Sequence, residues 1–118
     1  MNAKELMIGD KIRQRYSGLL LQVNSVQPPY ITAIGEGGRF HEDTIEPIPL
    51  TFEILEKNGF DCGSKKWFLP RYPTDKYFGL VMDESGAYYF EAFHKIQFVH
   101  ELQNVMRLCG IEKEIKLN

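Results

Sequence analysis

The sequence predicts an α+β fold, with N-terminal antiparallel strands followed by a short helix, a β-hairpin, a second helix and a terminal strand. Three observations predict it. Short runs of β-branched and aromatic residues alternate with turn residues through the first third of the chain. A helix-capping pattern follows two nearby prolines, and apolar residues recur at spacings of three and four near the end of the chain.

The first strands are expected at 11–16, 19–26, 30–34 and 39–42. Turn-forming residues separate them: Ser17-Gly18, Gln27-Pro28-Pro29 and the glycines of 35–38. Strands this short leave exposed edges unless the sheet curls on itself. We therefore expect a small SH3-like barrel or meander.

A connector and a short helix are expected next. Residues 45–50 contain Pro47 and Pro49, which cannot donate backbone hydrogen bonds, so this segment is expected to be an extended connector and not a central strand. Thr51 has the position of an N-cap, and Asn58-Gly59 that of a C-terminal stop. These signals predict a helix of about two turns.

The second half of the chain is expected to alternate strands with a longer helix. Strands are expected at 66–69, 77–82 and 87–93, with a hairpin turn at 83–86. The helix follows from one apolar stripe and a terminating glycine, formed by Phe98, Val99, Leu102, Val105, Met106, Cys109 and Gly110. In the last segment, 111–117, two apolar residues stand two apart among Lys and Glu, which predicts an amphipathic strand.

Length and composition are those of an ordinary globular protein. The 118 residues are 43% hydrophobic and 25% charged, which predicts one compact domain spanning 1–118, with a possible division into 1–50 and 51–118. Fourteen basic and sixteen acidic residues give a net charge of -2. The whole molecule is therefore not an electrostatic match for a polyanion, and a nucleic-acid site would have to be a local patch.

Cysteine use and hydropathy predict a cytoplasmic location. Cys62 and Cys109 are the two cysteines, too few for a disulfide framework, so both are expected to be free thiols in a reducing compartment. The first ten residues lack the apolar stretch of a secretory signal. No stretch approaches the roughly 20 apolar residues that cross a bilayer, so we expect no membrane association.

Three blocks carry a resemblance to a known group of proteins. They are LMIGD at 6–10, IPLTFEILEKNGF at 48–60 and FVHELQNVMRLCGI at 98–111. In these blocks the chain resembles small proteins encoded in prophages and other mobile elements of gut anaerobic bacteria, a family of unknown function. The resemblance implies a mobile-element origin and supplies no activity, ligand or catalytic residue.

The residue patterns indicate neither a metal site nor a catalytic centre. His41, Glu42 and Asp43 are adjacent, but neighbouring side chains of an extended segment point to opposite faces, and no second cluster stands at ligand spacing. His94 and His100 are six residues apart across a strand-to-helix junction. The cysteines and Ser64 lack the sequence context of an activated nucleophile. We therefore expect no cofactor, no metal and no enzymatic activity.

One segment, 65–78, combines basic and aromatic residues. Four basic residues and one acid give it a net charge of +3, whereas seven acids and two bases in 36–61 give -5. Cations among aromatic rings suit single-stranded nucleic acid or a partner peptide. The candidate partner-binding residues are Lys66, Trp67, Arg71, Tyr72, Lys76 and Tyr77.

The alternative interpretation is that these aromatic residues alternate into the core while the lysines face solvent. The loop 69–74 is least affected by this alternative, because its two prolines keep it out of a ladder and present Arg71 and Tyr72 outward.

Three functional hypotheses follow from the sequence. The favoured one is a non-enzymatic accessory protein that binds a protein partner through the 69–74 loop and one sheet edge. The second is binding of single-stranded nucleic acid through 65–78, which the negative net charge disfavours. The third is an unrecognised small enzyme. A homodimer is also possible, formed through the strand expected at 111–117.

Overall fold

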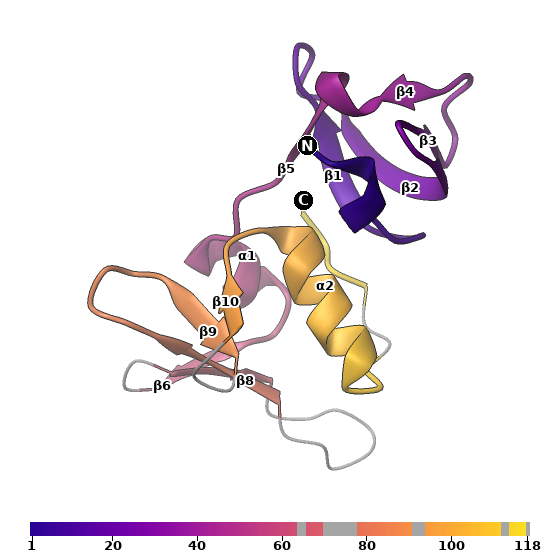
Figure 1. Ribbon diagram of the computed structural model, residues 1–118. Coiled ribbons are helices and arrows are strands. Elements are labelled where there is room, and N and C mark those ends of the chain that lie inside the picture. The colour runs from indigo at the N-terminus through magenta and orange to yellow at the C-terminus, as the bar shows by residue number, and fades with distance from the viewer. Residues whose placement is uncertain (64–65, 70–77, 91–93, 112–113, 118) are drawn as a thin grey trace. The chain divides into compact units, whose positions relative to one another are not determined.

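The computed structural model of residues 1–118 describes 1–63, 66–69, 78–90, 94–111 and 114–117. The described residues form two antiparallel sheets and two α-helices, which confirms the α+β class (Figure 1). The chain divides into two compact units. Unit 1 comprises 1–48 and 98–100, and unit 2 comprises 49–97 and 101–118.

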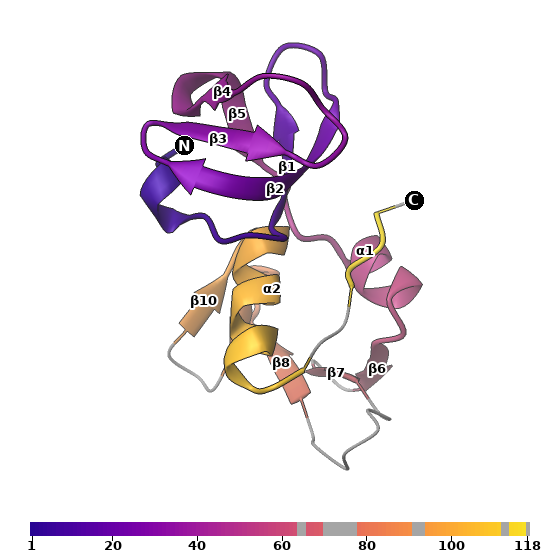
Figure 2. The ribbon, with the colours of Figure 1, turned by 90° about the vertical axis from the view of Figure 1, so that its right-hand side faces the viewer.

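Unit 1 is a five-stranded antiparallel sheet in the order β4-β3-β2-β1-β5 (Figure 2). Its strands are β1 (Lys11–Gln14), β2 (Leu20–Gln27), β3 (Tyr30–Ala33), β4 (Phe40–His41) and β5 (Ile45–Pro47). Two 3₁₀-helices, η1 (Ala3–Glu5) and η2 (Glu42–Thr44), precede β1 and β5. The four N-terminal strands expected from the sequence are confirmed, each within two residues of its expected ends.

The core of unit 1 follows from alternation along its strands. Ile12 on β1, Leu21 and Val23 on β2, and Ile31 on β3 are all at most 3% exposed. Their sequence neighbours are more exposed, because successive side chains of a strand point to opposite faces. Burial of these branched residues is the main force that holds the unit together.

A β-bulge interrupts this alternation in β2. Val23 pairs with Ala33, but the next paired residue is Ser25, opposite Thr32, so Asn24 is the extra residue. The shift places Val26 against the core although it lies three positions after Val23. A bulge also increases the local twist of the hairpin.

Residues 45–50 form more regular structure than the expected connector. Residues 45–47 are strand β5, which pairs with β1 at the edge of the sheet, and Ile12 is opposite Pro47. An edge position suits a proline, since its missing N–H interrupts no ladder. In unit 1 no ladder joins β4 to β5, so the sheet is not closed by hydrogen bonds.

Unit 2 contains a second antiparallel sheet in the order β10-β9-β8-β7-β6. Its strands are β6 (Asp61–Gly63), β7 (Lys66–Leu69), β8 (Phe78–Met82), β9 (Tyr88–Phe90) and β10 (His94–Ile96). The expected strand at 66–69 and the hairpin around 83–86 are confirmed. Residues 77 and 91–93 of the expected strands lie outside the described residues.

Sequence analysis missed the two outermost strands of this sheet. The segments around Cys62 and His94 had no strand assignment but form β6 and β10. Each strand has only three residues, and neither contains the run of β-branched or aromatic residues that marks a strand. Pairing with β7 and β9 therefore determines their conformation.

Helix α1 (Phe52–Lys57) has the ends that the sequence predicts. The Thr51 hydroxyl accepts a hydrogen bond from the N–H of Ile54 at 3.3 Å, and Asn58 is the C-cap. Gly59 follows with φ 84°, a left-handed conformation that terminates helices. A six-residue helix is too short to be stable alone, so its caps and the burial of Leu55 matter.

We predict that Thr51→Ala lowers the free energy of unfolding by about 1 kcal/mol, since it leaves an N-terminal N–H of α1 without its side-chain acceptor. Urea denaturation measures the loss. Thr51→Ser keeps the hydroxyl and should be near wild type. Equal stability of the alanine and serine variants would show that the cap contributes nothing.

Helix α2 (Val99–Leu108) confirms the predicted apolar stripe. Leu102, Val105 and Met106 are each at most 4% exposed, whereas Leu108 is 87% exposed. Gly110 has φ 75°, and the N–H of Ile111 donates to the carbonyl of Met106 at 2.8 Å. The glycine therefore ends the helix as expected.

The strand expected at 111–117 is not formed at 111 or at 114–117, the residues of this segment that the structure describes. Alternation is nevertheless present, because Ile115 is fully buried while Glu114 and Lys116 are exposed. The side chain of Asn58 bonds the backbone of Lys116 and takes the place of a neighbouring strand.

The turn between β8 and β9 depends on Asp83. Its Oδ1 accepts hydrogen bonds from the Ser85 hydroxyl at 2.6 Å, the Ser85 N–H at 2.9 Å and the Ala87 N–H at 3.0 Å. The bond from the Ser85 hydroxyl, followed by that from the Ala87 N–H, lowers the pKa of Asp83 below its ordinary 3.8. The carboxylate therefore favours the closed turn when it is ionised.

We predict that Asp83→Asn lowers the melting temperature at pH 7 and that the difference from wild type disappears in acid. A pKa below the unfolded value stabilises the fold above pH 3.8, and this stabilisation is lost as pH falls through the folded-state pKa. Melting curves between pH 7 and 2 measure it. Glu84→Gln, in the same turn, should follow wild type, and a pH-independent difference for Asp83→Asn would contradict the prediction.

Candidate interaction site

The basic and aromatic segment predicted as a binding surface is only partly covered by the structure. The backbones of Lys66 and Trp67 lie on β7, where Trp67 is opposite Cys62 on one side and Leu80 on the other. The other candidates, Arg71, Tyr72, Lys76 and Tyr77, lie outside the described residues. The assignment of this segment as a partner-binding surface stays a prediction.

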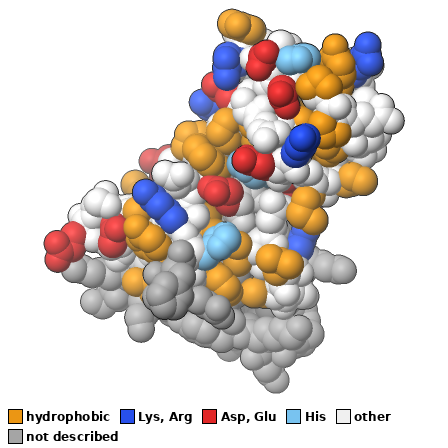
Figure 3. Space-filling model, in the orientation of Figure 1, with side chains coloured by type: hydrophobic (Ala, Val, Ile, Leu, Met, Phe, Trp, Pro, Cys, Tyr) orange, Lys and Arg blue, Asp and Glu red, His pale blue; other side chains and the backbone are white. Residues whose placement is uncertain are grey.

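A different site is present in unit 1. A hollow of about 570 Å³ lies between η1, the turn that joins β2 to β3, and η2. We call it the proline hollow, and its lining residues are Met1, Asn2, Lys4, Pro28, Pro29, Glu42 and Asp43. Hydrophobic, acidic and basic side chains are interspersed on the visible face of the molecule, so a mixed lining of this kind is typical of its surface (Figure 3).

Glu42 connects the three segments that line the proline hollow. Its carboxylate accepts a hydrogen bond from the N–H of Ala3 at 3.0 Å, which ties η2 to η1. Its own N–H donates to the carbonyl of Pro29 at 2.9 Å, which ties η2 to the β2–β3 turn. One residue therefore connects three segments that are far apart in the sequence.

Three side chains close in sequence to the lining residues Pro29 and Glu42 contact one another. Tyr30 follows Pro29 and pairs across the ladder with His41, which precedes Glu42. Their rings meet edge to face, with 5.2 Å between centroids, and the Arg39 guanidinium carbon lies 4.1 Å from the centroid of the Tyr30 ring. We call Tyr30, Arg39 and His41 the aromatic cluster.

Two further contacts fix the orientation of His41. Its Nδ1 accepts a hydrogen bond from the N–H of Asp43 at 3.1 Å, and the Thr44 hydroxyl donates to its carbonyl at 2.7 Å. His41 therefore works as the N-cap of η2, and this explains the His-Glu-Asp run that was weighed as a possible metal site.

Glu42 and His41 use their polar atoms to bond backbone groups of unit 1. Within the described part of the chain, no group of three or more His, Cys, Asp or Glu side chains is arranged to hold a metal ion. What the site offers a partner is two exposed prolines, a half-buried tyrosine and an exposed arginine.

Sequence analysis found the parts of this site but not their assembly. Pro28, Pro29 and the 39–42 strand were each identified, but as a turn and as a strand only. Tyr30 and His41 are brought together by the β3–β4 register, which depends on the length of the intervening glycine-rich loop. An aromatic residue directly after a Pro-Pro turn was the available signal.

No protein-family model, curated protein or solved structure matches the chain. Among the residues described, no helix is long and apolar enough to span a membrane.

We predict that Glu42→Ala lowers the free energy of unfolding by about 1.5 kcal/mol, because it removes a charged acceptor from the Ala3 N–H. Hydrogen exchange should show faster exchange of the Ala3 amide. Glu36→Ala removes an exposed carboxylate from the same unit and should leave both quantities unchanged. Unaltered exchange at Ala3 in Glu42→Ala would show that η1 does not depend on this bond.

Proposed function

We propose that this chain is a non-enzymatic protein-interaction module and that unit 1 binds an extended segment of a partner protein at the proline hollow. The observation that carries the proposal is the aromatic cluster, whose Tyr30 and His41 directly adjoin the lining residues Pro29 and Glu42 in sequence, and in which Arg39 stacks on Tyr30 and Tyr30 packs on His41. Tyrosine and arginine are the residues most enriched among those that dominate binding energy at interfaces.

The side chains of the aromatic cluster already contact one another, and this lowers the entropy cost of binding. Association is costly when flexible side chains must be immobilised, by about 0.5 to 1.5 kcal/mol for each. Here the Arg39 guanidinium already lies against a ring, and the Tyr30 ring already packs against a second ring. A partner that binds over these side chains therefore immobilises fewer flexible groups than it would on a surface of free side chains.

The topology of unit 1 supports an SH3-like module. The order β4-β3-β2-β1-β5, with β1 antiparallel to both β2 and β5, brings the first and last strands side by side. Helix η2 enters β5 directly, so the hollow lies beside the turn that starts the last strand. Small strand-rich modules of this kind commonly bind extended peptides.

The proposed setting is a prophage or another mobile element, with the protein acting in the cytoplasm. The three blocks that resemble mobile-element proteins support the origin. Two cysteines, of which the described Cys109 is a free thiol, suit a reducing compartment.

Binding of single-stranded nucleic acid through 65–78 is the second candidate. The net charge of +3 over that segment favours it, and the net charge of -2 over the chain opposes it. The two candidates differ in their response to salt, since affinity for nucleic acid falls steeply as salt rises.

The test is affinity copurification of the tagged full chain from a lysate of its native host, with and without nuclease, followed by mass spectrometry and nucleic-acid sequencing. The variant Tyr30→Ala/Arg39→Ala should retain at least about tenfold less of the partner protein than wild type, as expected for loss of a dominant contact. Circular dichroism confirms that the variant is folded.

Tyr16→Ala/Arg15→Ala is the matched control, because it removes the same two side-chain types from an exposed turn of the same unit. It should retain the partner as wild type does. Equal retention by both double variants would refute a role for the aromatic cluster. Retained nucleic acid that nuclease removes would favour the 65–78 segment instead.

A further inference from the structure

Arg39 of the aromatic cluster is held in position but its N–H groups are not used. Its guanidinium carbon lies 4.1 Å from the centroid of the Tyr30 ring, and the side chain is exposed. Within the part of the chain that the structure describes, no hydrogen bond or ion pair engages this guanidinium. Arg13, by contrast, bonds Glu46 in the same unit. The donors of Arg39 are therefore available to a partner.

The β3–β4 register explains why Arg39 stacks on Tyr30. Tyr30 is opposite His41, and Ile31 is opposite Phe40. Ile31 is buried and Phe40 packs against the core, so Tyr30 and His41 lie on the opposite face of the sheet. Arg39 precedes His41 by two residues and shares that face. Diagonal neighbours across an antiparallel pair are within reach of a long side chain.

The strands beside Arg39 do not neutralise its charge. Neither β2 nor β3 contains an acidic residue. On these strands Gln27 pairs with Tyr30, and Ser25 pairs with Thr32. The hydroxyls of Ser25 and Thr32 bond each other at 2.6 Å. The surface next to the guanidinium on these two strands is therefore polar but uncharged.

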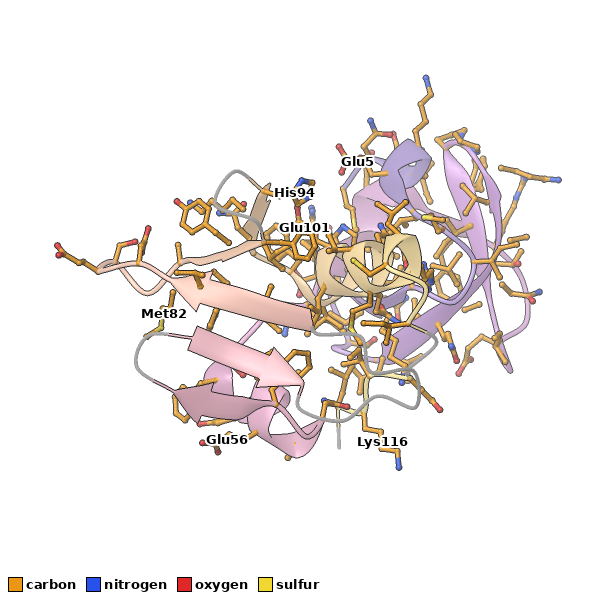
Figure 4. All side chains as sticks on the ribbon, turned by 90° about the horizontal axis from the view of Figure 1, so that it is seen from below. Glu5, Glu56, Met82, His94, Glu101 and Lys116 are labelled. Atoms are coloured by element: carbon orange, nitrogen blue, oxygen red, sulfur yellow. The ribbon has the colours of Figure 1, made fainter. Side chains whose placement is uncertain are left out.

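The six acidic residues of unit 1 have other positions or partners. Three of them accept hydrogen bonds within the unit: Asp10, Glu42 and Glu46. Glu36 is exposed in the loop before β4, and Asp43 lies 3.5 Å from Nδ1 of His41. Glu5 is exposed on η1, on the side that faces away from the strands (Figure 4). None of the six forms an ion pair with Arg39.

We propose that the extended segment that binds at the proline hollow carries an aspartate or a glutamate whose carboxylate pairs with Arg39. This inference rests on the proposed function and adds the chemistry of the partner. A guanidinium presents its N–H donors as a planar fork that matches the two oxygens of a carboxylate. The Tyr30 ring already holds this fork, so less side-chain entropy is lost when the pair forms.

A carboxylate fits this site better than a phosphate group or a nucleic acid. Lys4 is the basic side chain in the lining of the proline hollow, and Glu42 and Asp43 belong to the same lining. Lys4 and Arg39 are thus balanced by two acids, so the site has no excess of positive charge. Binding of nucleic acid depends on such an excess. One guanidinium instead matches the single negative charge of an acidic side chain.

The test is a selection from a phage-displayed library of short random peptides against the immobilised full chain. Peptides that wild type retains and Tyr30→Ala/Arg39→Ala loses are those that use the aromatic cluster. We expect Asp or Glu at one recurring position in these peptides. Changing that residue to Asn or Gln should weaken binding at least about tenfold, measured by fluorescence anisotropy of the labelled peptide.

Charge reversal isolates the contribution of Arg39. Arg39→Glu should select Lys or Arg at the recurring position, and it should bind the acidic peptides at least about tenfold more weakly than wild type. Arg15→Glu makes the same change on an exposed turn of the same unit and should select the same acidic peptides as wild type. Circular dichroism confirms that each variant is folded, and Arg39→Glu replaces the double variant if the latter does not fold.

The outcomes separate this inference from the proposed function. Peptides that depend on the aromatic cluster but have no recurring acid would overturn the inference and leave the proposed function intact. Unchanged selection by Arg39→Glu, or an equal loss with Arg15→Glu, would also overturn it. A library that yields no peptide lost by the aromatic-cluster variants would overturn both.

Discussion

Unpaired backbone groups are the constraint on which the rest of this structure depends. Elements of two to ten residues leave many N–H and C=O groups without a partner inside the element. Side chains supply the partners where the chain changes direction. Glu42, Thr51, Asn58 and Asp83 each bond backbone atoms at such a point. These four polar residues therefore have structural roles in this fold.

These side chains also determine which parts of the chain lie side by side. A residue that bonds the backbone of distant segments also brings their surfaces together. Glu42 joins η1 and the Pro-Pro turn, and the proline hollow lies between them. Asn58 holds residues 114–117 against α1. In both places a side-chain hydrogen bond to the backbone fixes the local geometry.

Much of the fold was predictable from sequence because its signals are local. Thr51, Gly59 and Gly110 mark helix ends by their own chemistry, and the β8–β9 turn is marked by an Asp and a Gly. What was not predictable depends on partners far along the chain. Strands β6 and β10 form only by pairing with β7 and β9, and the backbone of Lys116 bonds the side chain of Asn58, 58 residues away, in place of a neighbouring strand. The aromatic cluster likewise requires the β3–β4 register, which no local sequence pattern predicts.

Because of the bulge in β2, the position of Tyr30 depends on the number of residues in that strand. Val23 and Val26 both face the core only because one additional residue lies between them. Without it, everything from Ser25 to the Pro-Pro turn would rotate to the opposite face, since a one-residue slip exchanges the two faces of a strand. Deletion of Asn24 alone would therefore turn Val26 away from the core, although every core residue of the hairpin would be retained.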